Sequence, residues 1–355
     1  MRIGLLLYNP SPHQVDWLNA LSKESSVDCF IGFVHESNPA RAWGVPKPEL
    51  PWSYLPTSFV SIFSGRLKRW LRTQKADVWV LSSAYTSPVT QYLAWQLQRM
   101  GCKTVFLGEP PRPNSGLKGT VQILLLRSIL NKVSAVLATG QEAARRYQSL
   151  IKSDIPVCSM PYYIDLSNID MHSVKKKERG EIVRFIVAAQ LIHRKGIDVL
   201  IEACKLLPKE GWNLNIYGSG NLEKQLVKQA EDLGSAIRFC GAVPYETRYQ
   251  IFESADVFVF PTRWDGWGMV VPEALAHGVP VISTDQTMSA HDFIIDGKNG
   301  YIGSANDPNY LADKMTALIK NPEALSMLSG NCQSSLKNYS PEIGAKKLIE
   351  FLNDL

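Results

Sequence analysis

Residues 256–282 read DVFVFPTRWDGWGMVVPEALAHGVPVI, and this stretch decides the fold. The apolar run at 256–260 has the length and the β-branched and aromatic composition of a buried strand. A glycine-bearing turn follows it, then a helical segment at 270–277 and a second apolar strand at 279–283. Strand, turn, helix and strand in this order are typical of a βαβ unit in a parallel sheet.

The turn and the helix of this unit carry groups suited to binding a phosphorylated sugar. Gly266 and Gly268 permit close backbone approach, and the amides of 267–270 begin the helix, where they can hold a phosphate. Asp265 lies before the helix and Glu273 within it, so both can offer acceptors to sugar hydroxyls. The alternative is that the glycines only fit a tight corner and that Glu273 belongs to a capping network.

The same alternation of short apolar runs and helical patterns extends over almost the whole chain, which predicts an α/β fold with parallel sheets. The predicted strands are 2–8, 27–34, 77–83, 103–108, 134–139 and 156–160, then 183–189, 213–218, 237–240, 256–260, 279–283 and 300–302. The predicted helices are 13–25, 61–75, 87–100, 118–131 and 141–151, then 196–207, 221–233, 246–253, 270–277, 308–319 and 341–353.

Chain length and a polar linker divide this pattern into two Rossmann-like domains. A chain of 355 residues accommodates two domains of about 150 residues each. The stretch 163–181 is poor in apolar residues and separates domains at 1–165 and 166–340. We expect the two sheets to face each other across a cleft, because ligands of such folds bind at the carboxyl ends of the strands. The helix at 341–355 can pack back on the first domain, and the aperiodic region 35–58 is interpreted as a functional loop.

Composition favours a cytoplasmic globular protein. Hydrophobic residues make up 45% and charged residues 20%, which suits packed cores rather than disorder. No apolar run approaches the roughly 20 residues of a membrane span, and the N-terminus begins with a strand rather than a secretory signal. The six cysteines are scattered singly, as expected for reduced thiols.

The charge is divided unevenly between the two halves. Residues 1–165 carry 18 Lys and Arg against 10 Asp and Glu, whereas the remainder carries 20 against 23. A basic first half predicts an anionic partner for that half.

The sequence DGWGMVVPEALAHGVPVI at 265–282 resembles the signature E-G-F-G-x-x-x-x-E-A-x-A-x-G-x-P-V-I of the retaining glycosyltransferases of family 4, which have the GT-B fold. The resemblance implies that Glu273 holds the ribose of a nucleotide-sugar donor and that Asp265 binds hydroxyls of its hexose. Asp265 departs from the pattern, since most members carry Glu there. The resemblance also implies contacts to the donor sugar and diphosphate from Gly266, Trp267, Gly268, Met269 and Val270.

A second motif agrees with this resemblance. Residues 189–203 read AQLIHRKGIDVLIEA, similar to the family pattern G-R-L-x-x-x-K-G-x-x-x-L-I-x-A. Lys195 would neutralise the leaving diphosphate as its bond breaks, which is electrostatic stabilisation where charge develops. Gln190 replaces the usual arginine, so either Arg194 supplies that charge or Gln190 only hydrogen-bonds the donor. The alternative is that Arg194 and Lys195 are a solvated pair at a helix terminus.

Two shorter elements occur in the family's order. Residues 216–220 read IYGSG and 239–243 read FCGAV, similar to V-G-x-G and F-x-G-x-V. In the family these elements line the nucleotide, which implies donor contacts at Gly218 and Gly220 and base recognition by the backbone near Val243.

The first half matches the family less well, and its candidates concern the acceptor. The frequent Gly-Gly after the first strand is replaced by NPSPHQ at 9–14, so His13 is an acceptor-side candidate. Glu109 ends a strand where many relatives place a histidine near the donor sugar, so it is a candidate for a catalytic contact to sugar or acceptor. For both residues the alternative is a purely structural loop role.

The segment 59–75 places five cations among aromatic and aliphatic residues at helical spacing. A basic amphipathic helix of this kind can lie on an anionic membrane surface, which would make the protein peripheral to a membrane. The alternative is an ordinary domain helix with its cations in water. No stacking motif or DNA-binding module accompanies the charge, so nucleic acid is not expected as a partner.

Together these features predict a retaining, metal-independent hexosyltransferase. The resemblance implies a nucleotide-sugar donor, expected to be UDP-linked, and a glycan or lipid-linked glycan acceptor in cell-surface polysaccharide synthesis. No metal is expected because no D-x-D pair points to one, and no cofactor is expected because the nucleotide-sugar is a substrate. Two alternatives stay open: a UDP-sugar 2-epimerase on the same fold, and an inactive partner subunit that binds nucleotide-sugar.

Overall fold

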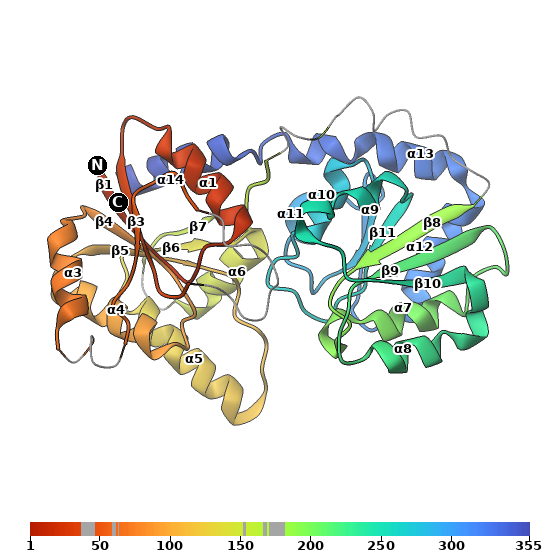
Figure 1. Ribbon diagram of the computed structural model, residues 1–355, viewed down its shortest axis with the longest axis horizontal. Helices are drawn as coiled ribbons and strands as arrows, with labels where there is room; N and C mark the ends of the chain where they lie inside the picture. The colour runs from red at the N-terminus through yellow and green to blue at the C-terminus, as the bar shows by residue number, and fades with distance from the viewer. Residues whose placement is uncertain (37–46, 59–61, 63, 152–153, 166–168, 170–181) are drawn as a thin grey trace. The chain divides into compact units, whose positions relative to one another are not determined.

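The structure is a computed structural model that describes the chain except for residues 37–46, 59–61, 63, 152–153, 166–168 and 170–181. The chain divides into two compact units. Unit 1 comprises Met1–Asp165 and Tyr339–Leu355, and unit 2 comprises Leu166–Asn338. The last helix, α14 (Pro341–Asn353), belongs to unit 1 and packs on α1 (Pro12–Ser22), as Figure 1 shows.

Unit 1 is built on a seven-stranded parallel sheet in the order β3-β2-β1-β4-β5-β6-β7. The strand order reverses next to β1, as in doubly wound folds. The strands are β1 (Arg2–Leu7), β2 (Asp28–Phe33), β3 (Trp52–Tyr54), β4 (Val78–Ser82), β5 (Lys103–Gly108), β6 (Ala135–Ala138) and β7 (Val157–Ser159).

Both faces of this sheet are buried, which explains why its strands are almost continuously apolar. Residues 3, 5 and 7 of β1 face a core completed by α1 and α14, whereas Leu6 faces the opposite core. The helices of that second core are α3 (Arg66–Gln74), α4 (Pro88–Arg99), α5 (Gly116–Leu130) and α6 (Gln141–Leu150).

Unit 2 repeats the plan with a six-stranded parallel sheet in the order β10-β9-β8-β11-β12-β13. The strands are β8 (Val183–Ala188), β9 (Trp212–Tyr217), β10 (Ile237–Gly241), β11 (Val257–Phe260), β12 (Val281–Thr284) and β13 (Gly300–Gly303). The expectation of two Rossmann-like parallel-sheet domains is therefore confirmed.

Helices cover both faces of the second sheet. One core is completed by α7 (Ile197–Cys204), α8 (Glu223–Gln229), α12 (Pro308–Lys320) and α13 (Pro322–Asn331). The other face carries α9 (Gln250–Glu253), α10 (Val270–Ala276) and α11 (Ala290–Phe293). Short 3-10 segments lie at His193–Lys195, Glu231–Ala236, Tyr245–Thr247 and Gln333–Leu336.

The structure corrects the sequence-based boundaries in several places. The region 35–58 is not a loop throughout, because β3 pairs with β2 near its end, and residues 37–46 of the region lie outside the described residues. Within the helix expected at 61–75, α3 begins at Arg66, after Gly65 with a φ of 73°, and residues 61 and 63 lie outside the described residues. The helix α13 was not predicted, although Asn321 caps it through Ala324 N at 3.0 Å and Pro322 begins it.

Candidate functional site

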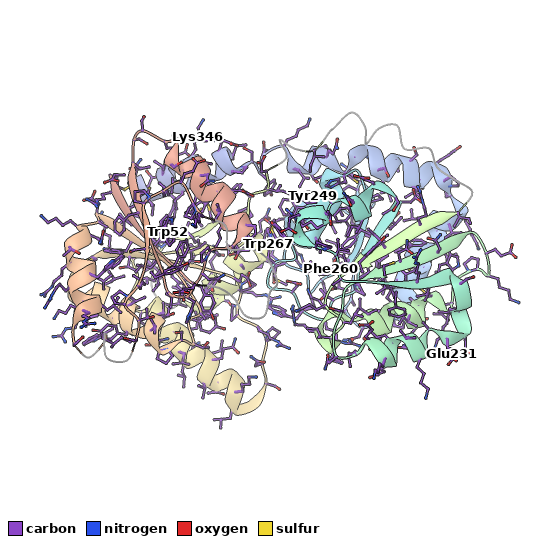
Figure 2. The ribbon with its side chains drawn as sticks, in the orientation of Figure 1. Trp52, Glu231, Tyr249, Phe260, Trp267 and Lys346 are labelled. Atoms are coloured by element: carbon purple, nitrogen blue, oxygen red, sulfur yellow. The ribbon has the colours of Figure 1, made fainter. Side chains whose placement is uncertain are left out.

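The candidate site lies in unit 2, in the segments that follow the carboxyl ends of β8, β9 and β11. In a parallel sheet these ends share one edge, which is where such folds bind ligands. Figure 2 labels Phe260, the last residue of β11, and Trp267 in the turn that follows it. The geometry of each segment follows from contacts within the unit.

Asp265 stands at the centre of the turn and faces two cations. Its carboxylate accepts a short hydrogen bond from Lys195 Nζ and lies 3.7 Å from Arg194 Nη1. Burial by itself raises the pKa of Asp265, but the positive charges of Lys195 and Arg194 outweigh it and hold the pKa below its usual value. Asp265 is therefore an ionised acceptor at neutral pH that binds Lys195 directly, whereas Arg194 Nη1 donates to the Trp264 carbonyl at 2.8 Å.

Lys195, the partner of Asp265, is largely buried and makes a second contact. Its side chain is 12% exposed, and its Nζ also lies 4.8 Å from the centre of the Phe260 ring, within cation–π range. Removing one member of a buried ion pair typically costs about 3–5 kcal/mol. The pair thus fixes the cationic turn against the turn that carries Asp265.

Arg263 provides a second link between the same two turns. It donates to the carboxylate of Asp198 at 2.8 and 2.6 Å and to the carbonyl of His193 at 2.6 Å. Burial alone raises the pKa of Asp198, but the hydrogen bonds and charge of Arg263 outweigh it and lower the pKa. Gly196 completes the contact with a φ of 69°, and a Cβ there would lie 2.0 Å from the Pro261 carbonyl oxygen.

The glycine turn leads directly into α10. Gly268 has a φ of 91°, and a Cβ there would lie 3.0 Å from a Thr287 methyl group. Trp267 is buried, and its backbone N–H donates to Asp265 at 3.3 Å. Met269 is the N-cap residue and Val270 the first residue of α10, and Gly266, Met269 and Val270 are half-buried. The amides at the start of α10 therefore lie in the chain directly after the ion-paired Asp265.

Glu273 lies one turn into α10 and is only 7% exposed. Its Oε1 accepts a hydrogen bond from Arg248 Nε at 3.2 Å. Desolvation by burial raises the pKa of Glu273 to about 7, although the charge of Arg248 opposes the shift. This carboxyl group is consequently poised to titrate near neutrality, unlike Asp265.

The turns after β8 and β9 are pressed together. A Cβ at Gly218 would lie 1.8 Å from the Ala189 carbonyl oxygen, and one at Gly220 would lie 2.3 Å from that of Leu191. Gln190 is exposed between these two contacts, and Val243 is half-buried after β10. The two glycines of the sequence motif therefore have a demonstrable packing role in addition to the implied donor contact.

The first-half candidates lie in unit 1. Glu109 is exposed directly after β5, where its Oε1 accepts from the Tyr162 hydroxyl at 3.2 Å and its carbonyl accepts from the Tyr147 hydroxyl at 2.7 Å. His13 belongs to α1, but its side chain lies outside the described residues.

The described helix of the basic segment 59–75, α3, packs its apolar side into the core of unit 1. Leu67 and Leu71 of α3 are buried in the core, and Arg66, Arg69 and Arg72 are exposed. Residues 59–61 and 63 of this segment lie outside the described residues. Within the described part, α3 therefore offers cations to a surface but no free apolar face.

Sequence reasoning missed the residues that support the two carboxylates. Arg248 contacts Glu273, and Arg263 with Asp198 clamps the turn of Lys195. The available signal for Arg248 was a cation flanked by aromatic residues in YETRY at 245–249. Among the described residues, no group of three or more His, Cys, Asp or Glu is placed to hold a metal ion, and no helix is long and apolar enough to cross a membrane.

Known proteins that are similar to this chain are glycosyltransferases. The family model described as Glycosyl transferases group 1 matches residues 168–334. An uncharacterized glycosyltransferase of Methanocaldococcus jannaschii is 31% identical over 167 residues, which is 46% of this chain and 46% of that protein. The poly(ribitol-phosphate) alpha-N-acetylglucosaminyltransferase of Staphylococcus aureus is 25% identical over 63% of this chain and 44% of that protein. The chain thus spans about half the length of the first curated relatives it matches.

Among solved structures, that of Anabaena HepE in complex with UDP superimposes with a TM-score of 0.79 at 15% identity and covers both chains completely. Two parallel-sheet Rossmann-like units of this kind define the GT-B fold, and the chain has that fold. The Glycosyl transferases group 1 model matches almost the whole of its second unit.

Proposed function

We propose that the protein is a retaining glycosyltransferase that moves a hexose from a nucleotide-sugar, expected to be a UDP-sugar, to a glycan or lipid-linked glycan. The observation that carries the proposal is the Lys195–Asp265 ion pair beside the start of α10. It combines an ionised acceptor for sugar hydroxyls with cations and amides for a diphosphate. The GT-B fold and the family match of unit 2 support the same assignment.

The reaction under this proposal needs positioning and charge stabilisation rather than covalent catalysis. Lys195 and Arg194 meet the diphosphate, whose negative charge grows as the bond to the sugar breaks. Asp265 holds hydroxyls of the transferred sugar, and Glu273 holds the ribose. The leaving diphosphate helps to deprotonate the acceptor hydroxyl on the same face, so the configuration at the anomeric carbon is retained. We propose that unit 1, with Glu109 and His13, receives the acceptor.

A donor screen tests the activity directly. Purified protein is incubated with individual UDP-sugars, and UDP release is measured with and without glycan acceptors, with Lys195→Ala as the matched control. We expect acceptor-stimulated UDP release by the native protein and a large loss in the variant. Conversion of the sugar to its epimer without an acceptor would indicate the epimerase, and UDP binding without turnover would indicate an inactive subunit. The same assay with EDTA tests metal independence, which a loss of turnover restored by Mg²⁺ would contradict.

We also propose that unit 1 contacts an anionic membrane, where a lipid-linked acceptor would be available. Arg66, Arg69 and Arg72 of α3 are exposed, and α5 exposes Leu117, Val121 and Leu124 by 82%, 46% and 59%. These three lie at i, i+4 and i+7 on one face of α5, next to the exposed Lys118. Apolar side chains beside cations suit the boundary between acyl chains and anionic headgroups. The protein would then be a peripheral protein on the cytoplasmic side.

A further inference from the structure

Arg248 is held in one orientation by contacts on several sides. Its Nη1 donates to the carbonyl of Tyr245 at 2.8 Å, and its Nη2 donates to the hydroxyl of Tyr249. The centre of the guanidinium lies 3.7 Å from the Tyr245 ring centroid and 4.0 Å from that of Tyr249. Planar guanidinium groups stack on aromatic rings in this way, whereas a lysine ammonium does not. The remaining nitrogen, Nε, is thereby aimed at one target.

That target is the Glu273 carboxylate, at 3.2 Å from Arg248 Nε. The side chain of Arg248 is 25% exposed and that of Glu273 is 9% exposed, so the pair lies where water screens it weakly. The contact uses Oε1, one of two carboxylate oxygens that together provide about four lone-pair sites. The ion pair is therefore compatible with hydroxyl groups of a ligand donating to the same carboxylate.

Aromatic groups lie beside this ion pair. His277 Nδ1 is 2.7 Å from the backbone carbonyl of Glu273, and its ring stacks on Phe252 and contacts Tyr249, which Figure 2 labels. The segment 245–249 contributes Arg248, and its Tyr245 and Tyr249 lie beside the guanidinium of that residue. Among these groups, Arg248 is the one that carries a fixed positive charge and touches the carboxylate itself.

We infer that Arg248 is a positioning residue for Glu273: held against two tyrosine rings, it favours the ionised carboxylate and orients it to accept hydrogen bonds from the ribose of a nucleotide. This inference rests on the proposed function, since it takes Glu273 as the ribose-binding residue. A neutral carboxyl group would keep a proton on one oxygen and would lose part of its capacity as an acceptor. Burial favours that neutral form, and Arg248 opposes it. Through Arg248 and Glu273, the aromatic segment 245–249 thereby influences nucleotide affinity.

The test is UDP binding measured by calorimetry between pH 5.5 and 9 for the native protein, Arg248→Gln and Arg248→Lys. We expect native affinity to fall below about pH 7 as Glu273 takes up a proton. In Arg248→Gln the midpoint moves upward by a unit or more, so that affinity at pH 7 drops about fivefold or more and recovers toward the native value at pH 9. Arg248→Lys retains the charge and keeps its midpoint closer to the native one than Arg248→Gln does.

Two controls identify the titrating group. Glu273→Gln should lose this dependence and show only that of the UDP phosphate, whose second pKa is about 6. His277→Asn should retain the native midpoint. Circular dichroism confirms that each variant is folded.

The outcomes separate the inference from the function. An equal loss of affinity at every pH in Arg248→Gln, or an unchanged midpoint, overturns the positioning role. A midpoint that disappears in His277→Asn also overturns it, because the titration then belongs to histidine. Failure of the native protein to bind UDP at any pH would instead contradict the proposed UDP-sugar donor.

Discussion

Unit 1 and unit 2 share one architecture, and both contain glycine turns with room for a Cβ, but the turns after β8, β9 and β11 of unit 2 are packed tightly against one another. In unit 2 the turns after β8, β9 and β11 press on one another where glycines leave no room for a Cβ, and Lys195 and Arg263 cross-link them. In unit 1, Gly65, Gly101 and Gly116 also have positive φ values, yet a Cβ at any of them would meet nothing within 4 Å. The difference shows that the residues of a turn can be predicted from sequence when close backbone contact, and not only a positive φ, requires glycine.

The sharpest test of this comparison is a pair of glycine substitutions. Gly218→Ala places a Cβ 1.8 Å from the Ala189 carbonyl oxygen at a φ of 137°, whereas Gly65→Ala adds only strain at a φ of 73°. We expect Gly218→Ala to lower the free energy of unfolding by about 2–6 kcal/mol, combining backbone strain with overpacking. Gly65→Ala should cost about 1–2 kcal/mol. Urea unfolding followed by circular dichroism measures both, and equal losses would contradict the distinction between the two kinds of turn.

Lys195→Ala tests whether the cross-link of unit 2 also serves the reaction. We expect kcat to fall by about 10²–10³, the usual cost of removing one preorganised group that stabilises developing charge. Because charge on the diphosphate grows during bond breaking, kcat should fall more than donor affinity. Lys195→Arg is the charge-retaining control. A raised donor KM with an intact kcat would make Lys195 a ground-state binder and not a catalytic residue.

Glu273→Ala and Glu109→Ala compare the two units in donor binding. Removing a charged hydrogen-bond partner costs about 1.5–3 kcal/mol, or roughly 10- to 150-fold in affinity. We expect this loss in UDP affinity for Glu273→Ala, whereas Glu109→Ala should lower transfer and leave UDP affinity unchanged. Calorimetry on the folded variants decides the matter. Unchanged affinity in Glu273→Ala would remove the ribose assignment.

These contrasts explain how much the sequence could predict. The alternation of apolar runs predicted both sheets, because strands buried on both faces must be apolar throughout. The motifs placed Asp265, Lys195 and Glu273 in unit 2, since backbone geometry restricts the glycines around them. Arg248 escaped prediction because its partner lies 25 positions away and the contact depends on how α10 packs. The strand β3 escaped prediction because a three-residue edge strand is too short to show a period. The helix α13 escaped because it follows α12 directly, so the sequence pattern hardly changes between the two helices.

Glu273 also predicts a pH dependence of folding. Its pKa is raised from 4.5 to about 7, so between these values the folded state binds more protons than the unfolded state. Stability therefore falls as pH rises from about 4.5 through 7, and the loss is complete above 7. Glu273→Gln should accordingly be more stable than the native protein at pH 8, by about 1–3 kcal/mol, and equal to it near pH 4.5. Thermal unfolding at the two pH values measures this, and the opposite order at pH 8 would mean that Arg248 outweighs burial.

The last comparison lies within unit 1 and has the smallest effect per residue. Each cation near an anionic surface contributes about 1 kcal/mol, and this attraction weakens with salt because screening acts within about 8 Å at physiological ionic strength. Changing Arg66, Lys68, Arg69 and Arg72 of α3 to Ser should therefore reduce co-sedimentation with anionic vesicles mainly at low salt. Changing Leu117, Val121 and Leu124 of α5 to Ser removes apolar contact, which salt does not screen, so its effect should persist at high salt. Since α3 buries Leu67 and Leu71 whereas α5 exposes these three apolar residues, the two sets divide the binding into an electrostatic and an apolar part. Equal pelleting of all three proteins, or none of the native protein at low salt, would leave both helices as ordinary parts of the unit 1 surface and the donor site of unit 2 unaffected.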